Sequence, residues 1–85
     1  MAENMELHFI LTALRTSDKA RLHLIDRCIE SNNSKFVVCW NYDTNNQTWD
    51  WGTYCGDLKS ALSAFVEKCR EHVFDTVHEG FLAMK

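Results

Sequence analysis

The sequence contains no proline and only three glycines among its 85 residues. Linkers between domains are usually rich in such residues, so their scarcity favours one continuous domain over residues 1–85. The chain also lacks an apolar run close to the ~20 residues that a membrane-spanning helix needs. Its first nine residues carry two acids and no lysine or arginine, unlike a secretory signal. We therefore expect a single intracellular domain.

Positive charge is also scarce. Nine lysines and arginines stand against twelve aspartates and glutamates, which gives a net charge of −3. Proteins that bind nucleic acid through phosphate contacts need clustered basic side chains, so this balance argues against direct nucleic-acid binding. The apolar share of 46% and the charged share of 25% are typical of a globular chain and too apolar for a disordered one.

The motifs of metal sites and of common catalytic centres are missing as well. The four cysteines, Cys28, Cys39, Cys55 and Cys69, form no C-x-x-C pair. Cys69 and His72 lie close in sequence, but no third group is placed to orient them. There is no glycine-rich phosphate loop and no H-E-x-x-H motif. We expect reduced thiols, no metal, no cofactor, no catalytic residue and no enzymatic activity.

Two runs of alternating apolar and polar residues open the chain. The alternation predicts strands over residues 5–14 and 20–29, joined by a turn at "TSDK". Folding the runs together places Ala13 opposite Leu22, Leu11 opposite Leu24, and Leu7 opposite Cys28, so apolar residues meet.

A helical interpretation of the same runs stays open. Leu7, Ile10, Leu11 and Leu14 also fit the i, i+3, i+4, i+7 spacing of a helix. This interpretation would change the fold from a strand-rich one to an α-α-β-β-α arrangement.

A second hairpin is predicted from the β-branched and aromatic residues of residues 35–42 and 48–55, which flank the turn "DTNNQ". Direct pairing would set Tyr42 opposite Trp49 and Trp40 opposite Trp51. The same register sets two further pairs, Val38 with Thr53 and Phe36 with Cys55.

A long helix is expected over residues 57–79, with Asp57 as its N-cap and Gly80 after its end. Its apolar stripe comprises Leu58, Leu62, Phe65, Val66, Cys69, Val73 and Val77. The predicted fold is α+β: an antiparallel four-stranded meander with this helix packed on one face.

One helix covers only one face of such a sheet, so the other face needs a different explanation. We expect Val37, Cys39 and Tyr54 to lie inward against the helix, because the small Cys39 and the bare Gly52 leave room for it. The aromatic side chains of the opposite face would then form a partner-binding surface, a homodimer interface, or an aromatic ladder that only stabilises the sheet through cross-strand pairs. These side chains are Trp40, Tyr42, Trp49 and Trp51.

Two further features are candidate contacts. Phe74 points away from the predicted apolar stripe and lies near the tail residues Phe81 and Leu82, which could pack on it. Acidic residues recur at every fourth position, a pattern typical of a solvated helix face or of a surface that meets a basic partner. They are Glu67, Glu71, Asp75 and Glu79.

The segments "FVVCWNYD" and "TWDWGTYCGDLKSALSAF" resemble small proteins encoded by phages and mobile elements of Firmicutes bacteria. Those proteins have a V-V-x-W-x-Y-D strand, a W-x-x-G-x-Y strand and an L-x-x-A-L-x-x-F helix start. Some small acidic phage proteins are anti-CRISPR inhibitors that occupy a nuclease surface. The resemblance implies a bacterial host cytoplasm and a protein partner, which could be a CRISPR effector nuclease.

The leading hypothesis is thus a non-enzymatic protein-binding module, in the form of an anti-CRISPR-type inhibitor that occludes a partner surface. The alternative is a small DNA-binding transcriptional regulator. It requires an N-terminal helix-turn-helix, in which Arg15, Lys19, Arg21 and Arg27 would contact phosphates.

Overall fold

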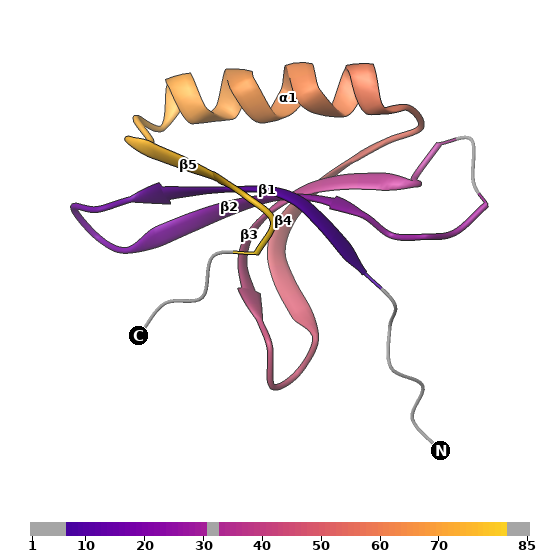
Figure 1. Cartoon of the computed structure of the whole chain (residues 1–85), viewed down its shortest axis with the longest axis horizontal. Helices are drawn as coiled ribbons and strands as arrows, with labels where there is room; N and C mark the ends of the chain where they lie inside the picture. The colour runs from indigo at the N-terminus through magenta and orange to yellow at the C-terminus, as the bar shows by residue number, and fades with distance from the viewer. Residues whose placement is uncertain (1–6, 31–32, 82–85) are drawn as a thin grey trace.

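A computed structural model describes residues 7–30 and 33–81 of the chain. The elements follow in the order β1 (His8–Arg15), β2 (Ala20–Asp26), β3 (Phe36–Asp43), β4 (Thr48–Cys55), α1 (Leu58–Glu71) and β5 (Thr76–Glu79). The strands form one antiparallel sheet in the order β4-β3-β2-β1-β5, and α1 lies across one face of it (Figure 1).

The predicted α+β meander and its C-terminal helix are confirmed, with a fifth strand added. The α-α-β-β-α alternative is wrong, because both N-terminal runs form strands. Ala13 pairs with Leu22 and Leu11 with Leu24, as predicted, up to an irregularity between Phe9 and Leu11. The predicted pairing of Leu7 with Cys28 does not form, since β2 ends at Asp26. The part of the predicted first strand before residue 7 lies outside the described residues.

The helix ends earlier than predicted, at Glu71 rather than at residue 79. Val73 adopts a positive φ of 58°, which turns the chain back toward the sheet. The β-branched residues Thr76 and Val77 then favour a strand, and the open edge of β1 supplies its hydrogen-bonding partner. Gly80 has the positive φ expected of a stop residue, 77°, but it follows β5 instead of a helix.

The main core lies between the sheet and α1. Its buried residues are Ala13, Leu22, Leu24, Phe36 and Val38 from the strands, with Ala61 and Phe65 from the helix. A second apolar cluster forms on the opposite face around Ile25, Val37 and Cys39. The predicted orientation of β3 is therefore wrong, because Val37 and Cys39 point away from α1.

The surroundings of Gly52 are consistent with Val37 and Cys39 lying on the face opposite α1. A Cβ atom at Gly52 would lie 3.0 Å from Tyr54 Cε1, 3.1 Å from Trp49 Nε1 and 3.1 Å from Val37 Cγ2. The space left by the missing side chain is thus occupied by two rings on the far face, not by the helix. In addition, Trp49 Nε1 donates a hydrogen bond to the Tyr54 hydroxyl at 3.3 Å.

Candidate functional site

The hairpin of β3 and β4 is regular at one end and irregular at the other. Val38 pairs with Thr53 as predicted, but Trp40 then pairs with Asp50 rather than with Trp51. Asn41 and Trp51 have positive φ values of 51° and 45°. Asparagine tolerates this conformation, whereas a tryptophan adopts it only where the surroundings impose it. Bulges of this kind re-aim side chains and are frequent beside functional sites.

The irregularity distributes the aromatic side chains over different surfaces. Trp40 packs at the edge of the core under α1, whereas Trp49 packs on the opposite face. Tyr42 lies with Trp49, their ring centroids 6.2 Å apart. Trp51 remains 84% exposed. The predicted single aromatic face is therefore wrong, because alternation along the strand is broken at Asn41.

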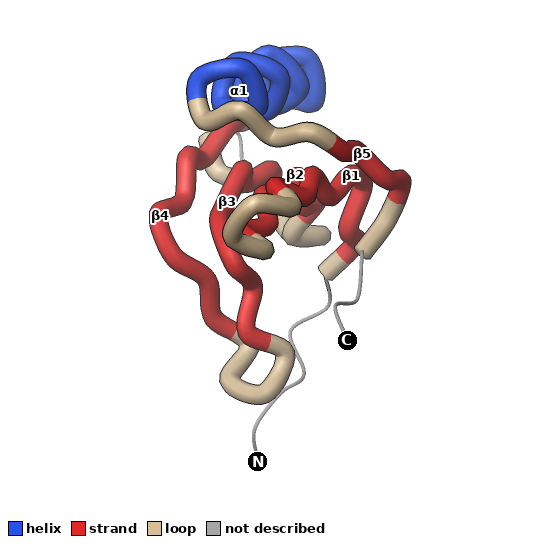
Figure 2. Tube along the Cα trace, turned by 90° about the vertical axis from the view of Figure 1, so that its left-hand side faces the viewer, coloured by secondary structure: helices blue, strands red, loops and turns tan. Residues whose placement is uncertain are grey.

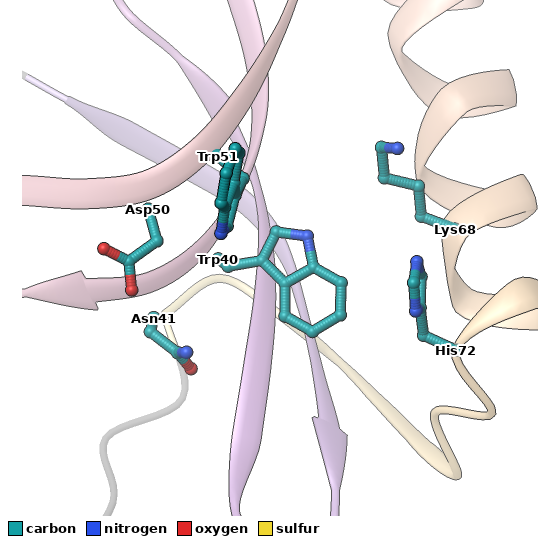
Figure 3. A pocket seen from close by; sticks show the side chains of 6 residues that line it. All are labelled: Trp40, Asn41, Asp50, Trp51, Lys68 and His72. Atoms are coloured by element: carbon teal, nitrogen blue, oxygen red, sulfur yellow. The ribbon is translucent and has the colours of Figure 1, made fainter.

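Trp40 and Trp51 nevertheless meet at one pocket of about 480 Å³. The hairpin forms one side of this pocket and the C-terminal end of α1 forms the other, as Figure 3 shows. Its lining residues are Trp40, Asn41, Asp50, Trp51, Lys68 and His72. We call this site the tryptophan pocket.

The position of Trp40 in the pocket is fixed by its neighbours. The His72 ring meets it edge-on, with centroids 4.8 Å apart, and the Phe74 ring lies 5.3 Å away. The Arg15 guanidinium carbon lies 5.7 Å from the Trp40 centroid. Arg15 also donates a 2.6 Å hydrogen bond to the His72 carbonyl, which ties β1 to the end of the helix. This end of the site is thus preorganised, while Trp51 projects freely.

Asp18 completes the anchor of Arg15. The carboxylate pairs with the Arg15 guanidinium at 2.8 Å. The hydrogen bond from Arg15, followed by that from the Ala20 amide, lowers the pKa of Asp18 to about 2. Asp18 therefore stays ionised at neutral pH and holds Arg15 against Trp40.

The pocket combines two indole surfaces with the carboxylate of Asp50 on the hairpin and the side chains of Lys68 and His72 at the end of α1. Burial raises the pKa of the nearby Cys69 thiol and raises that of Cys39 to about 12, so both stay protonated and poorly nucleophilic. Among the described residues, no cluster of three or more His, Cys, Asp or Glu side chains is arranged to hold a metal.

His23, which the sequence analysis did not single out, is a buried histidine on the face opposite α1. It is fully buried, because both faces of β2 are covered. The Thr12 hydroxyl donates to the Gly80 carbonyl at 2.7 Å, so His23 Nδ1 must be the donor in its 3.0 Å contact with Thr12. His23 Nε2 has no partner, and burial, with a smaller effect from Arg21, lowers the pKa to about 4. The apolar neighbours Leu22 and Leu24 were the feature of the sequence that could have indicated the burial of His23.

Rings surround His23. Phe81 stacks on it with centroids 5.7 Å apart, and Phe9 meets it edge-on at 5.5 Å. The predicted packing of Phe81 on Phe74 is therefore wrong, because Phe81 contacts Phe9 and Tyr42 instead. Leu82 lies outside the described residues.

The predicted acidic stripe is also divided. Glu67 and Glu71 are exposed on α1, but Asp75 lies beyond the helix and Glu79 lies in β5. The Asp75 carboxylate accepts hydrogen bonds from the Thr16 amide and hydroxyl, both at 2.9 Å. Asp75 thus has a structural role in joining the β1–β2 turn to the end of α1.

No family model, curated protein or solved structure matches this chain. Within residues 7–30 and 33–81, no helix is long and apolar enough to cross a membrane. The function is therefore inferred from the geometry of the tryptophan pocket and its surroundings.

Proposed function

We propose that the protein is a non-enzymatic protein-binding module and that the tryptophan pocket holds its partner. The observation that carries this proposal is Trp51, an indole 84% exposed on a strained backbone beside a preformed cavity. Tryptophan is enriched among the residues that dominate binding energy at interfaces. An exposed indole next to a fixed one can enclose an apolar side chain of the partner.

The charged side chains that line the tryptophan pocket indicate which partner segment would bind there. Lys68 and His72 face the two indoles across the pocket (Figure 3). Asp50 lies on the hairpin side, so a segment with an apolar side chain between the indoles and a carboxylate directed toward Lys68 would bind best, because that carboxylate gains a charged hydrogen bond.

The resemblance to phage and mobile-element proteins gives the proposal a specific form, an anti-CRISPR-type inhibitor. In this form Trp51 anchors the protein on an effector nuclease. Glu67 and Glu71, both exposed on α1, then lie against basic residues that otherwise contact nucleic-acid phosphates.

The alternative of a DNA-binding regulator loses its structural basis. It required a helix-turn-helix within residues 5–30, but the described part of that segment forms β1 and β2. Arg15 is also committed to Asp18 and to the His72 carbonyl, rather than being presented to a phosphate.

The test compares Trp51→Ala with Tyr54→Ala, which truncates a 45% exposed ring on the other face. Partner capture from a bacterial host lysate, followed by cleavage assays with purified CRISPR effector nucleases, should show that Trp51→Ala loses binding and inhibition at least tenfold. Tyr54→Ala should retain both. Capture that survives Trp51→Ala overturns the proposed site, and capture of a partner without inhibition of any nuclease overturns only the anti-CRISPR form.

A further inference from the structure

The helix does not lie centrally on the sheet. α1 packs against β2, β3 and β4, whereas β1 and β5 form the other part of the same face. Figure 2 shows α1 above the sheet, with β5 at the edge opposite β4. A helix is about 10–12 Å wide and neighbouring strands are about 4.8 Å apart, so one helix covers two or three of five strands. The part of this face that α1 leaves uncovered, over β1 and β5, is about as wide as one further helix.

An apolar groove of about 500 Å³ occupies this place. Val66 and Val73 contribute from α1 and the turn after it, and Leu11, Phe74 and Val77 contribute from the sheet side. Val73 is 72% exposed, Val77 54% and Val66 52%. We call this surface the valine groove.

The apolar surface continues along the helix. Leu62 and Leu58 lie one and two helical turns before Val66 and are also exposed. The sequence predicted that all of these residues would face the core, but only Phe65 and Cys69 of the predicted stripe pack against it. The helix therefore has an apolar surface wider than its own sheet covers, and monomeric proteins rarely expose contiguous surfaces of this kind.

Basic residues border the same surface. Arg70 lines the valine groove. Lys59 lies eleven residues earlier, which is three helical turns and thus the same side of α1. The chain as a whole is acidic, and Glu79 lies opposite Leu11 at the β5 border of the groove, so the two bases mark a preference for acidic ligand residues at the α1 border. Glu67 lies beyond Arg70, near Ser63 on the outer surface of α1.

We propose that the valine groove binds an amphipathic helix of another protein, whose apolar side faces the groove and whose acidic residues lie beside Arg70 and Lys59. The width of the uncovered surface matches a helix, and helices bind apolar grooves in this way through residues spaced three and four apart. A second copy of this chain fits poorly. Two α1 helices packed antiparallel along their stripes would bring Lys59 of each close to Arg70 of the other, so like charges would meet.

This site shares no lining residue with the tryptophan pocket, since Lys68 and His72 lie on the other side of α1, although Phe74 of the groove also contacts Trp40. The two inferences can therefore fail separately.

The experiment titrates the full chain with two synthetic amphipathic helices and follows backbone amide signals by NMR. Both peptides have leucines on one side, and the border residues are glutamates in one and lysines in the other. The glutamate peptide should shift the amides of Val66, Val73 and Val77 and bind at least tenfold more tightly than the lysine peptide. Arg70→Glu should reverse the preference, and Val66→Ser should weaken binding while leaving the circular dichroism unchanged.

Three outcomes would overturn the proposal. The first is equal affinity for the two peptides, or binding of neither. The second is a set of shifts centred on Trp51 instead of on the valine groove. The third is a stable dimer in sedimentation velocity that Val66→Asp dissociates, because the groove would then be occupied by a second copy.

Discussion

The hairpin of β1 and β2 and the hairpin of β3 and β4 are built from strands of seven or eight residues, yet they are used differently. In β2, four consecutive residues are buried, so both faces of that strand serve the core. In β4, by contrast, every residue is exposed or only partly buried. The sheet thus has a stable centre and an irregular edge, and the larger aromatic side chains lie toward the edge.

This difference separates residues that maintain the fold from residues available for binding. Side-chain size does not decide which is which. Leu24 is smaller than Trp51, but it is completely buried while Trp51 is almost completely exposed. The two proposed binding surfaces lie where α1 meets the margins of the sheet, and Phe65 is the one residue of the buried core that lines either of them among the described residues.

The largest expected effect tests this contrast directly. Leu24→Ala should lower the free energy of unfolding by about 2–5 kcal/mol, because the truncated side chain leaves a cavity between the sheet and α1. Trp51→Ala, although it removes more atoms, should change that free energy by less than about 0.5 kcal/mol. Urea unfolding followed by circular dichroism measures both. Comparable losses in the two variants would show that Trp51 supports the fold.

The second prediction concerns the loss of folding stability at acidic pH. Since burial holds the pKa of His23 at about 4 in the folded chain, against an ordinary value of 6.5, the folded state resists protonation. The contribution of neutral His23 is complete above the unfolded pKa, and it is lost as the pH falls from about 6.5 toward 4. The total loss should be about 3 kcal/mol.

His23→Gln should remove this part of the pH dependence, and His78→Gln, at an exposed position on β5, should retain it. The urea concentration at the midpoint of unfolding is measured at pH 7 and pH 4.5 for both variants. Because both keep every carboxylate, the difference between them reports the histidine alone. If wild type and His23→Gln lose the same stability on acidification, then His23 is not the buried neutral group.

A smaller effect is expected at Gly52, on the irregular hairpin. Gly52→Ala should cost about 1–3 kcal/mol, because the new methyl group would crowd the rings of Tyr54 and Trp49. The matched variant Gly80→Ala has open space around the new methyl group but a positive φ, so its cost arises from the backbone. Tryptophan fluorescence should therefore change in Gly52→Ala and stay constant in Gly80→Ala. An unchanged spectrum in both would contradict the packing described for Trp49.

The elements of the fold could be predicted largely from the sequence, because alternation and turn composition are local properties. The strand pairing of Ala13 with Leu22 followed from matching two such patterns. Three features escaped prediction because they depend on tertiary structure. The strand Thr76–Glu79 exists because β1 offers an open edge, and its residues alone continue a helical pattern.

The other two are the orientation of β3 and the bulge at Asn41. Alternation says which residues share a face, but it does not say which face meets the helix. Once Asn41 breaks the alternation, Trp40 and Tyr42 no longer share a face. The tryptophan pocket itself was not predicted: Trp40 and Trp51 were expected as a cross-strand pair on one aromatic face, whereas Trp40 pairs with Asp50, and Lys68 and His72 were not expected beside them.

The hydrogen bond from the Thr12 hydroxyl to the Gly80 carbonyl joins residues 68 positions apart. It links β1, the first strand of the described residues, to the segment that follows β5, the last strand. The edge of β1 therefore stays unpaired until β5 has been translated, and the nascent hairpins present an open strand to their surroundings during that interval. Assembly of the complete five-stranded sheet must follow synthesis of β5, and it should be slower than the formation of either hairpin because a long loop has to close first.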